Sequence, residues 1–435
     1  MRGYYWAKMI AHVGAKANIS GSLVGLKKPN YAGVATHMQL SFNDLTFILG
    51  NEAQLRAMPE QATYPAFAPE ILALLHTFSR LTLQDAEAKA WPDVVSLGFW
   101  CREASLAQMQ ATYGDLPNRY GRGVVFHIAP GNVAANFAYS LLTGLLTGNA
   151  NIVRLPGRDH PQVAIIVRLL AAALAQHPAL APYICLLRYE RQQSINDALS
   201  ALCDTRIIWG GDETIAQIRR SPLKPRAREI AFADRYSIAA IDADSYLAHV
   251  DKDKLARAFF NDTLLNDQNA CSSPSLVVWL GKETQAAREC FWQHFHAFAA
   301  RFYTLEPVAA VNKLTRLCLL GATWPGVKKV SADDNLLVRI ELPEVNSAVM
   351  DLRGNCGFFL EYVAESLDDI VPVCGERCQT LATFGIENAV VTEWLAARRP
   401  QGIDRVVPFG RTLDFTLQWD GYDLVAMLTR TVAIG

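Results

Sequence analysis

The amino-acid sequence predicts an α/β protein with two interleaved Rossmann-like domains, each built on a parallel sheet with helices on its faces. From residue 121 onward, short apolar runs alternate with glycine or proline turns and longer helical segments. This order is typical of parallel sheets covered by helices. A second series of the same kind begins near residue 240, and 51% of the 435 residues are hydrophobic. The chain is therefore long and apolar enough for two or three domains.

The first series begins with Val124–Ile128, an apolar, β-branched run that ends at Pro130-Gly131-Asn132. We predict a buried strand followed by a turn, and then an apolar helix that ends near Leu146. The alternation continues with predicted strands at 152–155, 184–187 and 206–209, and predicted helices at 163–175, at 196–202 and after Gly210-Gly211.

The second series begins with a predicted strand at 238–241. A long helix from about Leu247 leads to a polar segment before Cys271, and a strand at 275–280 restarts an alternation that continues to Tyr303. Before residue 100 the pattern is weaker, with turn signals at Pro29-Asn30 and Asn43-Asp44.

These patterns predict three parts of the chain. A first domain spans residues 1–235 and a second spans residues 236–404. A C-terminal segment, residues 405–435, returns to the first domain or forms an oligomer interface.

The composition of the chain argues against two kinds of binding partner, nucleic acid and membranes. Lys and Arg number 41 and Asp and Glu 42, a net charge of -1, which gives no general attraction to nucleic acid or an anionic membrane. The longest uncharged stretch, between Arg122 and Arg154, contains polar residues that fit poorly in hydrocarbon, so we expect no membrane span. Nine cysteines and a start without a secretory signal predict reduced thiols in a cytoplasmic protein.

Cys271 is the first candidate for chemistry. It lies in a small polar loop, Asn266–Pro274, just before an apolar strand. Such a loop can present a thiolate, the attacking form of cysteine, to a cleft. Taken alone the signal is weak, because a buried, inert cysteine is commoner.

Two turns are further candidates. In Trp209-Gly210-Gly211-Asp212, a glycine pair between strand and helix lets the backbone approach a diphosphate, although the GxGxxG pattern is absent and a plain tight turn is the alternative. Asn132, after the first strand, can donate to a developing oxyanion, although loop asparagines usually serve turns.

Glu229 is a candidate general base, because it lies beside an apolar run where burial can raise a carboxyl pKa. The alternative is an ion pair with Arg226 or Arg228. Another signal is weaker. His294 and His296 are more often a surface or core pair than metal ligands, so no metal site is predicted.

In order along the chain, these segments resemble the acyl-CoA reductases of the bacterial bioluminescence fatty-acid reductase type, a branch of the aldehyde dehydrogenase superfamily. The matching segments run from His127 to Asp423 and agree in order and spacing. They are His127–Val133 with Asn136-Phe137, Gly144–Pro156, Trp209–Glu213, Arg228-Glu229, Cys271–Pro274, Gln379–Leu381 and Trp419–Asp423.

The resemblance implies an aldehyde-dehydrogenase-like fold and roles for individual residues. Cys271 resembles the acyl-accepting nucleophile, Asn132 the oxyanion-hole asparagine, and Glu229 the general base. The glycines that follow this base in the superfamily are Ala231 and Phe232 here, which puts the role of Glu229 in doubt.

The same resemblance assigns residues 1–235 to the cofactor and residues 236–404 to catalysis. Pro130, Gly210, Gly211 and Asp212 would contact the cofactor. Arg154, one residue out of register with a cofactor-binding lysine, would suit the 2′-phosphate of NADPH.

The implied reaction is the NADPH-dependent reduction of an acyl thioester, carried by CoA or by a protein, to an aldehyde through acyl-Cys271. Homo-oligomers and an acyl-activating partner enzyme are expected by the same resemblance. Two other functions stay open. One is an NAD(P)-dependent aldehyde dehydrogenase working oxidatively, and the other is an acyl-accepting scaffold subunit without turnover.

Overall fold

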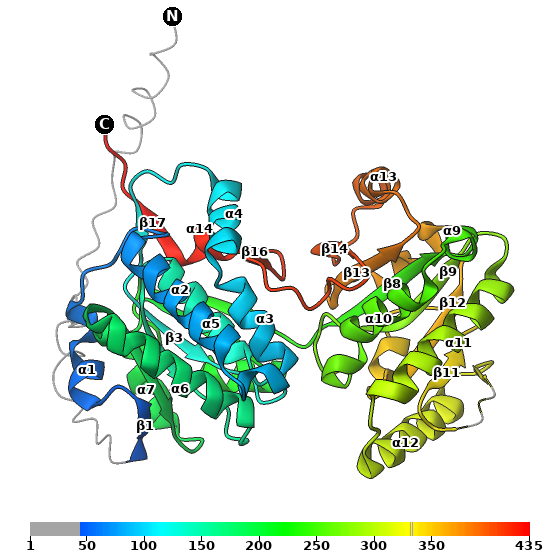
Figure 1. The fold of residues 1–435 in the computed structure, drawn as a ribbon, viewed down its shortest axis with the longest axis horizontal. Coiled ribbons are helices and arrows are strands. Elements are labelled where there is room, and N and C mark those ends of the chain that lie inside the picture. The colour runs from blue at the N-terminus through cyan, green and yellow to red at the C-terminus, as the bar shows by residue number, and fades with distance from the viewer. Residues whose placement is uncertain (1–43, 331, 333) are drawn as a thin grey trace, which may run out of the picture. The chain divides into compact units, whose positions relative to one another are not determined.

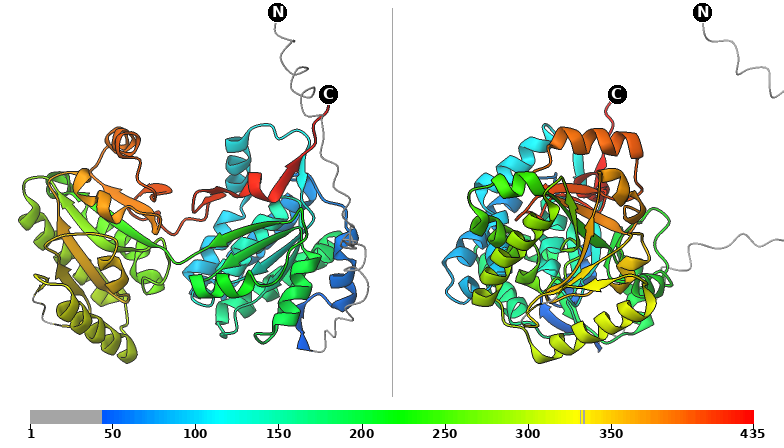
Figure 2. Two further views of the ribbon diagram at one scale, coloured as in Figure 1. Left: turned by 180° about the vertical axis from the view of Figure 1, so that it is seen from behind. Right: turned by 90° about the vertical axis from the view of Figure 1, so that its right-hand side faces the viewer.

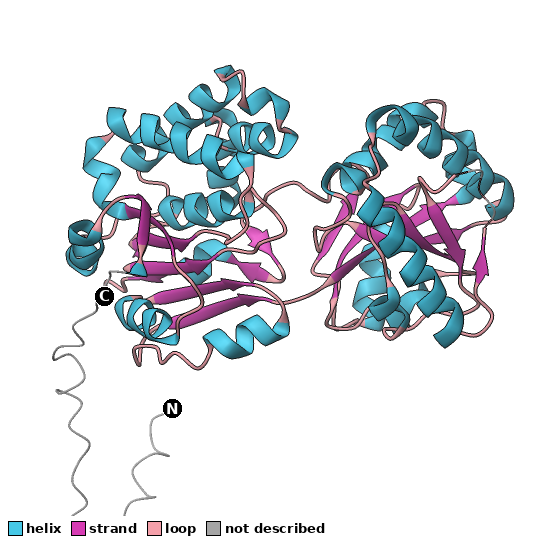
Figure 3. Cartoon of the chain, turned by 90° about the horizontal axis from the view of Figure 1, so that it is seen from below, coloured by secondary structure: helices cyan, strands magenta, loops and turns pink. Residues whose placement is uncertain are grey.

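The computed structural model describes residues 44–330, 332 and 334–435. The predicted turn at Pro29-Asn30 lies outside these residues, as does the rest of the chain before residue 44. Two sheets, both mostly parallel and both flanked by helices, dominate the described part (Figures 1 and 3). The predicted α/β class with two parallel-sheet domains is confirmed.

The first sheet has the strand order β1-β5-β4-β3-β6-β7, and only its edge strand β1 is antiparallel to its neighbour. Its strands are β1 Thr46–Leu49, β3 Val124–Ile128, β4 Ala150–Arg154, β5 Ile184–Arg188, β6 Thr205–Trp209 and β7 Arg228–Phe232. Strands β3 and β6, both inside the strand order, are buried along their whole length, as their apolar sequences predict.

Helices surround this first sheet. They are α1 Glu52–Ala57, α2 Pro69–Gln84, α3 Pro92–Trp100, α4 Glu103–Tyr113, α5 Asn136–Leu146, α6 Pro161–Gln176, α7 Gln193–Leu202 and α8 Asp212–Ile218. Helix α6 begins two residues before the predicted start, because Pro161 fits the first turn of a helix, where no N–H is needed.

The second sheet has the order β10-β11-β12-β9-β8-β13-β14, with only β10 antiparallel. Its strands are β8 Tyr236–Asp242, β9 Pro274–Leu280, β10 Lys328–Lys329, β11 Val338–Glu341, β12 Phe358–Val363, β13 Cys378–Phe384 and β14 Arg405–Pro408. Alternate residues of β8 and β9 enter two separate apolar cores, one on each face. The sheet is therefore covered on both sides.

The helices of this part are α9 Ala243–Ala248, α10 Lys252–Asp262, α11 Thr284–Phe302, α12 Pro307–Thr323 and α13 Asn388–Arg398. The single long helix predicted from about Leu247 is wrong. The chain forms α9 and α10 instead, because the Asp251 side chain accepts a hydrogen bond from the N–H of Lys254 at 2.9 Å and starts a new helix.

The chain after β14 returns to the first sheet's side of the molecule (Figure 2). It forms the hairpin β15 Gln418–Trp419 and β16 Tyr422–Asp423, then α14 Leu424–Leu428 and β17 Thr429–Thr431. Strand β17 pairs with β2 Arg119–Gly121, and the Asn149 amide donates to the carbonyl of Leu428 at 3.0 Å. Among the described residues, no helix is both long and apolar enough to cross a membrane.

Candidate active site

A cavity of about 860 Å³ lies at the carboxyl ends of β3, β6 and β7. Ile128, Trp209 and Phe232, the last residues of these strands, line it, together with the loop that precedes β9. Ligands of open α/β sheets usually bind at this edge, where the loops can be shaped without disturbing the sheet.

The loop before Cys271 is held in an unusual conformation. Asp267 and Gln268 both have positive φ values, 52° and 55°. Residues other than glycine rarely adopt this backbone conformation. Buried Gln268 fixes the loop, because its side-chain Oε1 accepts from the N–H groups of Gly357 at 2.7 Å and Phe358 at 3.1 Å. The loop is therefore tied to the start of β12.

Cys271 is half-buried, and two contacts fix it. Its carbonyl accepts a hydrogen bond from the Ser237 hydroxyl at 2.7 Å. Its Sγ accepts one from Nε2 of Gln379 at 3.3 Å. The same Gln379 nitrogen donates to Oδ1 of Asp420, so one amide links the sulfur to a carboxylate.

Burial, and to a smaller extent the negative charge of Asp420, raise the pKa of the Cys271 thiol to about 12. The Gln379 hydrogen bond and the Arg235 guanidinium act in the opposite direction. Burial also raises the pKa of Asp420 above its usual range. The thiol is therefore protonated at neutral pH.

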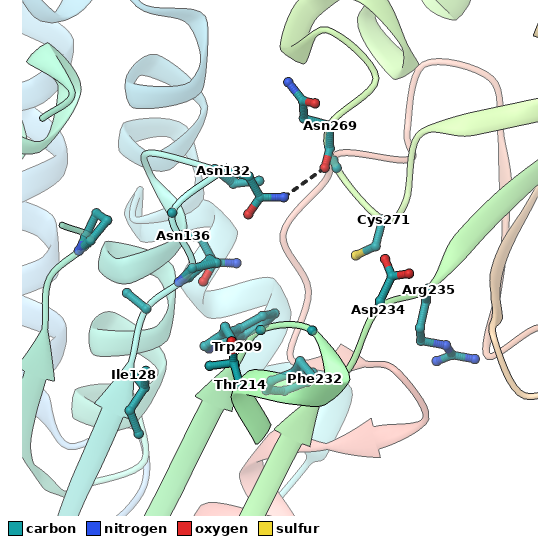
Figure 4. A pocket seen from close by; sticks show the side chains of 18 of the residues that line it. Ile128, Asn132, Asn136, Trp209, Thr214, Phe232, Asp234, Arg235, Asn269 and Cys271 are labelled. Atoms are coloured by element: carbon teal, nitrogen blue, oxygen red, sulfur yellow. Dashed lines mark hydrogen bonds between the residues drawn. The ribbon is translucent and has the colours of Figure 1, made fainter. Parts of the chain in front are cut away.

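Asn132 lies on the loop after β3, across the cavity from Cys271. Its Nδ2 donates to the carbonyl of Asn269 at 3.1 Å, two residues before the cysteine (Figure 4). The structure therefore brings the predicted oxyanion donor to the predicted nucleophile's loop from the other sheet. Among the described residues, this amide nitrogen makes no second hydrogen bond.

The glycine turn after β6 lies on the same cavity. Its Trp209 indole stacks on Phe232 at 3.7 Å between ring centroids. A Cβ atom added at Gly211, or at Gly131 after β3, would meet no atom within 4 Å, so both backbones border open space. Asp212 does not line the cavity; it is exposed in the first turn of α8.

The remaining predicted cofactor contacts also line the cavity. Pro130 lies two residues after the end of β3, and Arg154 ends β4. The Arg154 guanidinium lies over the Tyr189 ring, 4.5 Å from its centroid. Buried Oδ1 of Asn136 and Oγ of Ser273, both in the lining, have no hydrogen-bond partner among the described residues. Open glycine backbones and unpartnered polar atoms fit a large polar ligand such as a nicotinamide dinucleotide.

Glu229 is not brought to this cavity. It is the second residue of β7, three residues before Phe232, so it lies about 10 Å from the carboxyl edge. Its carboxylate accepts from Nε of Arg206 at 2.9 Å and from Nε of Arg219 at 2.7 Å. The ion pair weighed as the alternative exists, with these two arginines in place of Arg226 or Arg228.

Gln379, Asp420 and Arg235 were not predicted as site residues. Gln379 and Asp420 lie in two segments that match the family, so a signal was present, but neither could be linked to Cys271 without the fold. His127 is a core residue: burial lowers its pKa to about 4, and Ser140 and Asn151 contact its two ring nitrogens.

The histidine pair is also explained by surface contacts. His294 contacts Asp253 at 2.8 Å, and His296 contacts Asp334 at 2.8 Å. Within the described residues, no group of three or more potential ligands could hold a metal ion.

The model of one family, described as acyl-CoA reductase (LuxC), matches residues 93–310, half of the chain. The chain belongs to this family. A long-chain acyl-protein thioester reductase of Aliivibrio fischeri is 26% identical over 162 residues, 37% of this chain and 32% of that protein. The Photorhabdus luminescens protein of the same name is 22% identical over 299 residues, 67% of this chain and 59% of its own length. This member of the family thus spans less than two thirds of these relatives.

Solved structures of dehydrogenases have a fold similar to that of this chain. Lactaldehyde dehydrogenase from Escherichia coli matches with a TM-score of 0.59 at 13% identity, over 88% of this chain and 89% of that one. A 1-pyrroline-5-carboxylate dehydrogenase from Thermus, with bound NAD, matches with a TM-score of 0.59 at 13% identity, over 89% and 86%. The predicted aldehyde-dehydrogenase-like fold is confirmed.

Proposed function

We propose that this protein reduces an acyl thioester to an aldehyde, with NADPH as the reductant and an acyl group carried on Cys271. One observation carries the proposal: the cysteine loop, the Asn132 loop and the glycine turn, predicted separately, line one cavity. Membership of the acyl-CoA reductase family and the dehydrogenase fold support it.

The first step is the exchange of thioesters at Cys271. The Sγ atom forms a bond to the acyl carbonyl carbon, and the bond to the donor's sulfur breaks. The proton of the Cys271 thiol ends on the departing thiol, so the step needs no other reactant. Asn132 and the backbone N–H of Cys271 donate to the oxyanion, and loss of one such donor typically costs about 10²–10³ in rate.

A nicotinamide cofactor, when bound, supplies the hydride that reduces the acyl-cysteine to the aldehyde. Gly211 and Pro130, both in the cavity lining, would border its diphosphate, and Arg154 would bind a phosphate on its ribose. Cys271 leaves as the aldehyde is released and regains a proton. The hydrogen bond from Gln379 holds the sulfur in position both when it attacks the thioester and when it leaves the aldehyde.

The acyl donor is a thioester of CoA or of a protein. Relatives named long-chain acyl-protein thioester reductases favour the protein-bound form. An acyl-activating partner enzyme and a homo-oligomeric state belong to the same proposal.

An oxidative aldehyde dehydrogenase is the second candidate, since its fold is shared. It needs a base that activates water to hydrolyse the acyl-enzyme. Glu229, the base predicted from the resemblance, does not line the cavity and is hydrogen-bonded to two arginines, Arg206 and Arg219. This placement favours the reductive direction, in which no water is required.

The proposal is tested with a Cys271→Ser variant and a Cys318→Ser control, because Cys318 is an exposed cysteine on α12. Wild type and control should form one acyl adduct by intact mass and consume NADPH with acyl-CoA. Cys271→Ser should lose the acyl adduct and NADPH consumption together. Reduction at the wild-type rate by Cys271→Ser would refute the mechanism, and an adduct without NADPH consumption in wild type would indicate a scaffold subunit.

A further inference from the structure

A second cavity, of about 560 Å³, lies at the opposite edge of the first sheet. Strands β3, β6 and β7 begin there, five residues before the carboxyl edge, which puts it about 16 Å from the active-site cavity. Five arginines from three segments of the chain line it. They are Arg119, Arg122, Arg226, Arg228 and Arg430. We call this site the arginine cavity.

The positive charge of the arginine cavity is not neutralised by the protein. Its one carboxylate, Asp204, is already used: Lys224 Nζ lies 3.1 Å from Oδ1, and the N–H of Val124 donates to Oδ2 at 2.9 Å. None of the five arginines forms an ion pair within the described part of the chain. The cavity therefore has five arginine charges close together and one carboxylate, which also pairs with Lys224.

The contacts that these arginines do make are few. Arg122 donates through Nη1 to the carbonyl of Thr429 at 3.3 Å, while its buried Nε has no partner among the described residues. Arg430 lies over the Tyr120 ring at 5.7 Å. Burial lowers the pKa of Arg122, and the charges of Arg228, Arg226 and Arg430 lower it further. A multivalent anion would relieve this repulsion and fill the open donors.

We propose that the arginine cavity binds an oligophosphate group, at a site separate from the active site. Guanidinium groups bind phosphate oxygens through two parallel N–H bonds, and several of them converge here. Among the described lining residues none is aromatic, so there is no stacking surface for a base. The phosphate chain itself is therefore the recognised part, whether it is free or carried by a nucleotide.

The test is calorimetric titration of the full chain with inorganic pyrophosphate and with ATP at constant ionic strength. We expect both to bind wild type, and Arg228→Ala combined with Arg430→Ala to weaken binding about 100-fold, since one charged hydrogen bond is worth about tenfold or more. Both arginines are exposed, so the variant should fold. Arg316→Ala on α12, an exposed arginine elsewhere, is the matched control and should bind as wild type.

A further variant, Arg154→Ala, separates the two cavities. Pyrophosphate binding that survives in this variant and is lost in the double variant supports the arginine cavity. Loss in Arg154→Ala alone would place the anion in the active-site cavity and overturn the proposal. Binding of a hexaglutamate peptide in preference to both phosphates would also overturn it, since the cavity would then be a docking site for an acidic protein.

Discussion

Two shielded carboxylates near the cysteine site differ in what surrounds them. Glu229 retains 17% of its side-chain exposure and faces two guanidinium groups, Arg206 and Arg219. Asp420 retains 5% and faces the Gln379 amide and Arg235, which it shares with Asp404. Glu229 lies on β7, an edge strand of the first sheet, and does not line the cavity. Asp420 lines the cavity that contains Cys271.

The difference shows that sequence context and burial alone do not identify a working carboxylate. The Glu229 carboxylate contacts two guanidinium groups and does not line the cavity. Glu229 therefore connects β7 to β6 and α8. Asp420 instead acts on the cysteine through its charge and through Gln379.

The largest expected effect is on stability, from Glu229→Gln. It leaves Arg206, which is 3% exposed, without its charged partner. Breaking a buried pair from one side typically costs about 3–5 kcal/mol. We expect the free energy of unfolding in urea to fall by about 3 kcal/mol, with the rate per folded molecule unchanged. A loss of about 10²–10⁴ in rate at unchanged stability is the result expected of a general base, and it would reverse our comparison.

A double variant, Arg206→Met with Glu229→Leu, is the control for this prediction. Replacing both ions by apolar side chains leaves no unpaired charge, so most of the lost stability should return. If the double variant is as unstable as Glu229→Gln, then packing and not charge explains the loss.

This comparison also shows what could be predicted from the sequence. The strand Val124–Ile128 and the glycine turn after β6 were predicted where they occur, because fully buried parallel strands leave a local apolar pattern. The break between α9 and α10 was missed, because it depends on one capping side chain, Asp251. Local apolar patterns therefore predict the strands and helices, whereas single capping side chains determine where a helix begins or ends.

The candidate active site likewise contains residues that could be predicted from the sequence and residues that could not. Asn132 and Gly211 each follow a strand of the first sheet, so their meeting at its carboxyl edge could be expected from topology. Cys271 instead precedes β9 of the second sheet, so its place on the same cavity could not be expected from that rule. Gln379 and Asp420 are 108 and 149 residues from Cys271 in sequence, and only the return of the C-terminal segment brings Asp420 to the cysteine. Long-range contacts of this kind leave no periodic signal.

The next effect is on the cysteine itself, from Gln379→Ala. This change removes the donor to Sγ, which favours the thiolate. The pH midpoint for alkylation of Cys271 by iodoacetamide should move up, and the alkylation rate at pH 8 should fall about tenfold, the usual loss for a hydrogen bond to a charged group. The measurement uses a Cys318→Ser background, so that an exposed thiol does not obscure the result. An unchanged midpoint would mean that this contact does not act on the thiolate.

A second effect on the same thiol should have the opposite sign, from Asp420→Asn. The negative charge of Asp420 disfavours a thiolate on Cys271, so its removal lowers the pKa of the thiol. Since the thiolate is the species that is alkylated, the midpoint should move to lower pH and the rate at pH 8 should rise. The same assay and background apply, with Glu229→Gln as the matched carboxylate change, which should leave the midpoint unchanged because Glu229 does not reach the cavity. If Asp420→Asn instead slows alkylation, Asp420 accepts the proton of the thiol, and the carboxylate on the cavity would then be a base where we have assigned it only a charge.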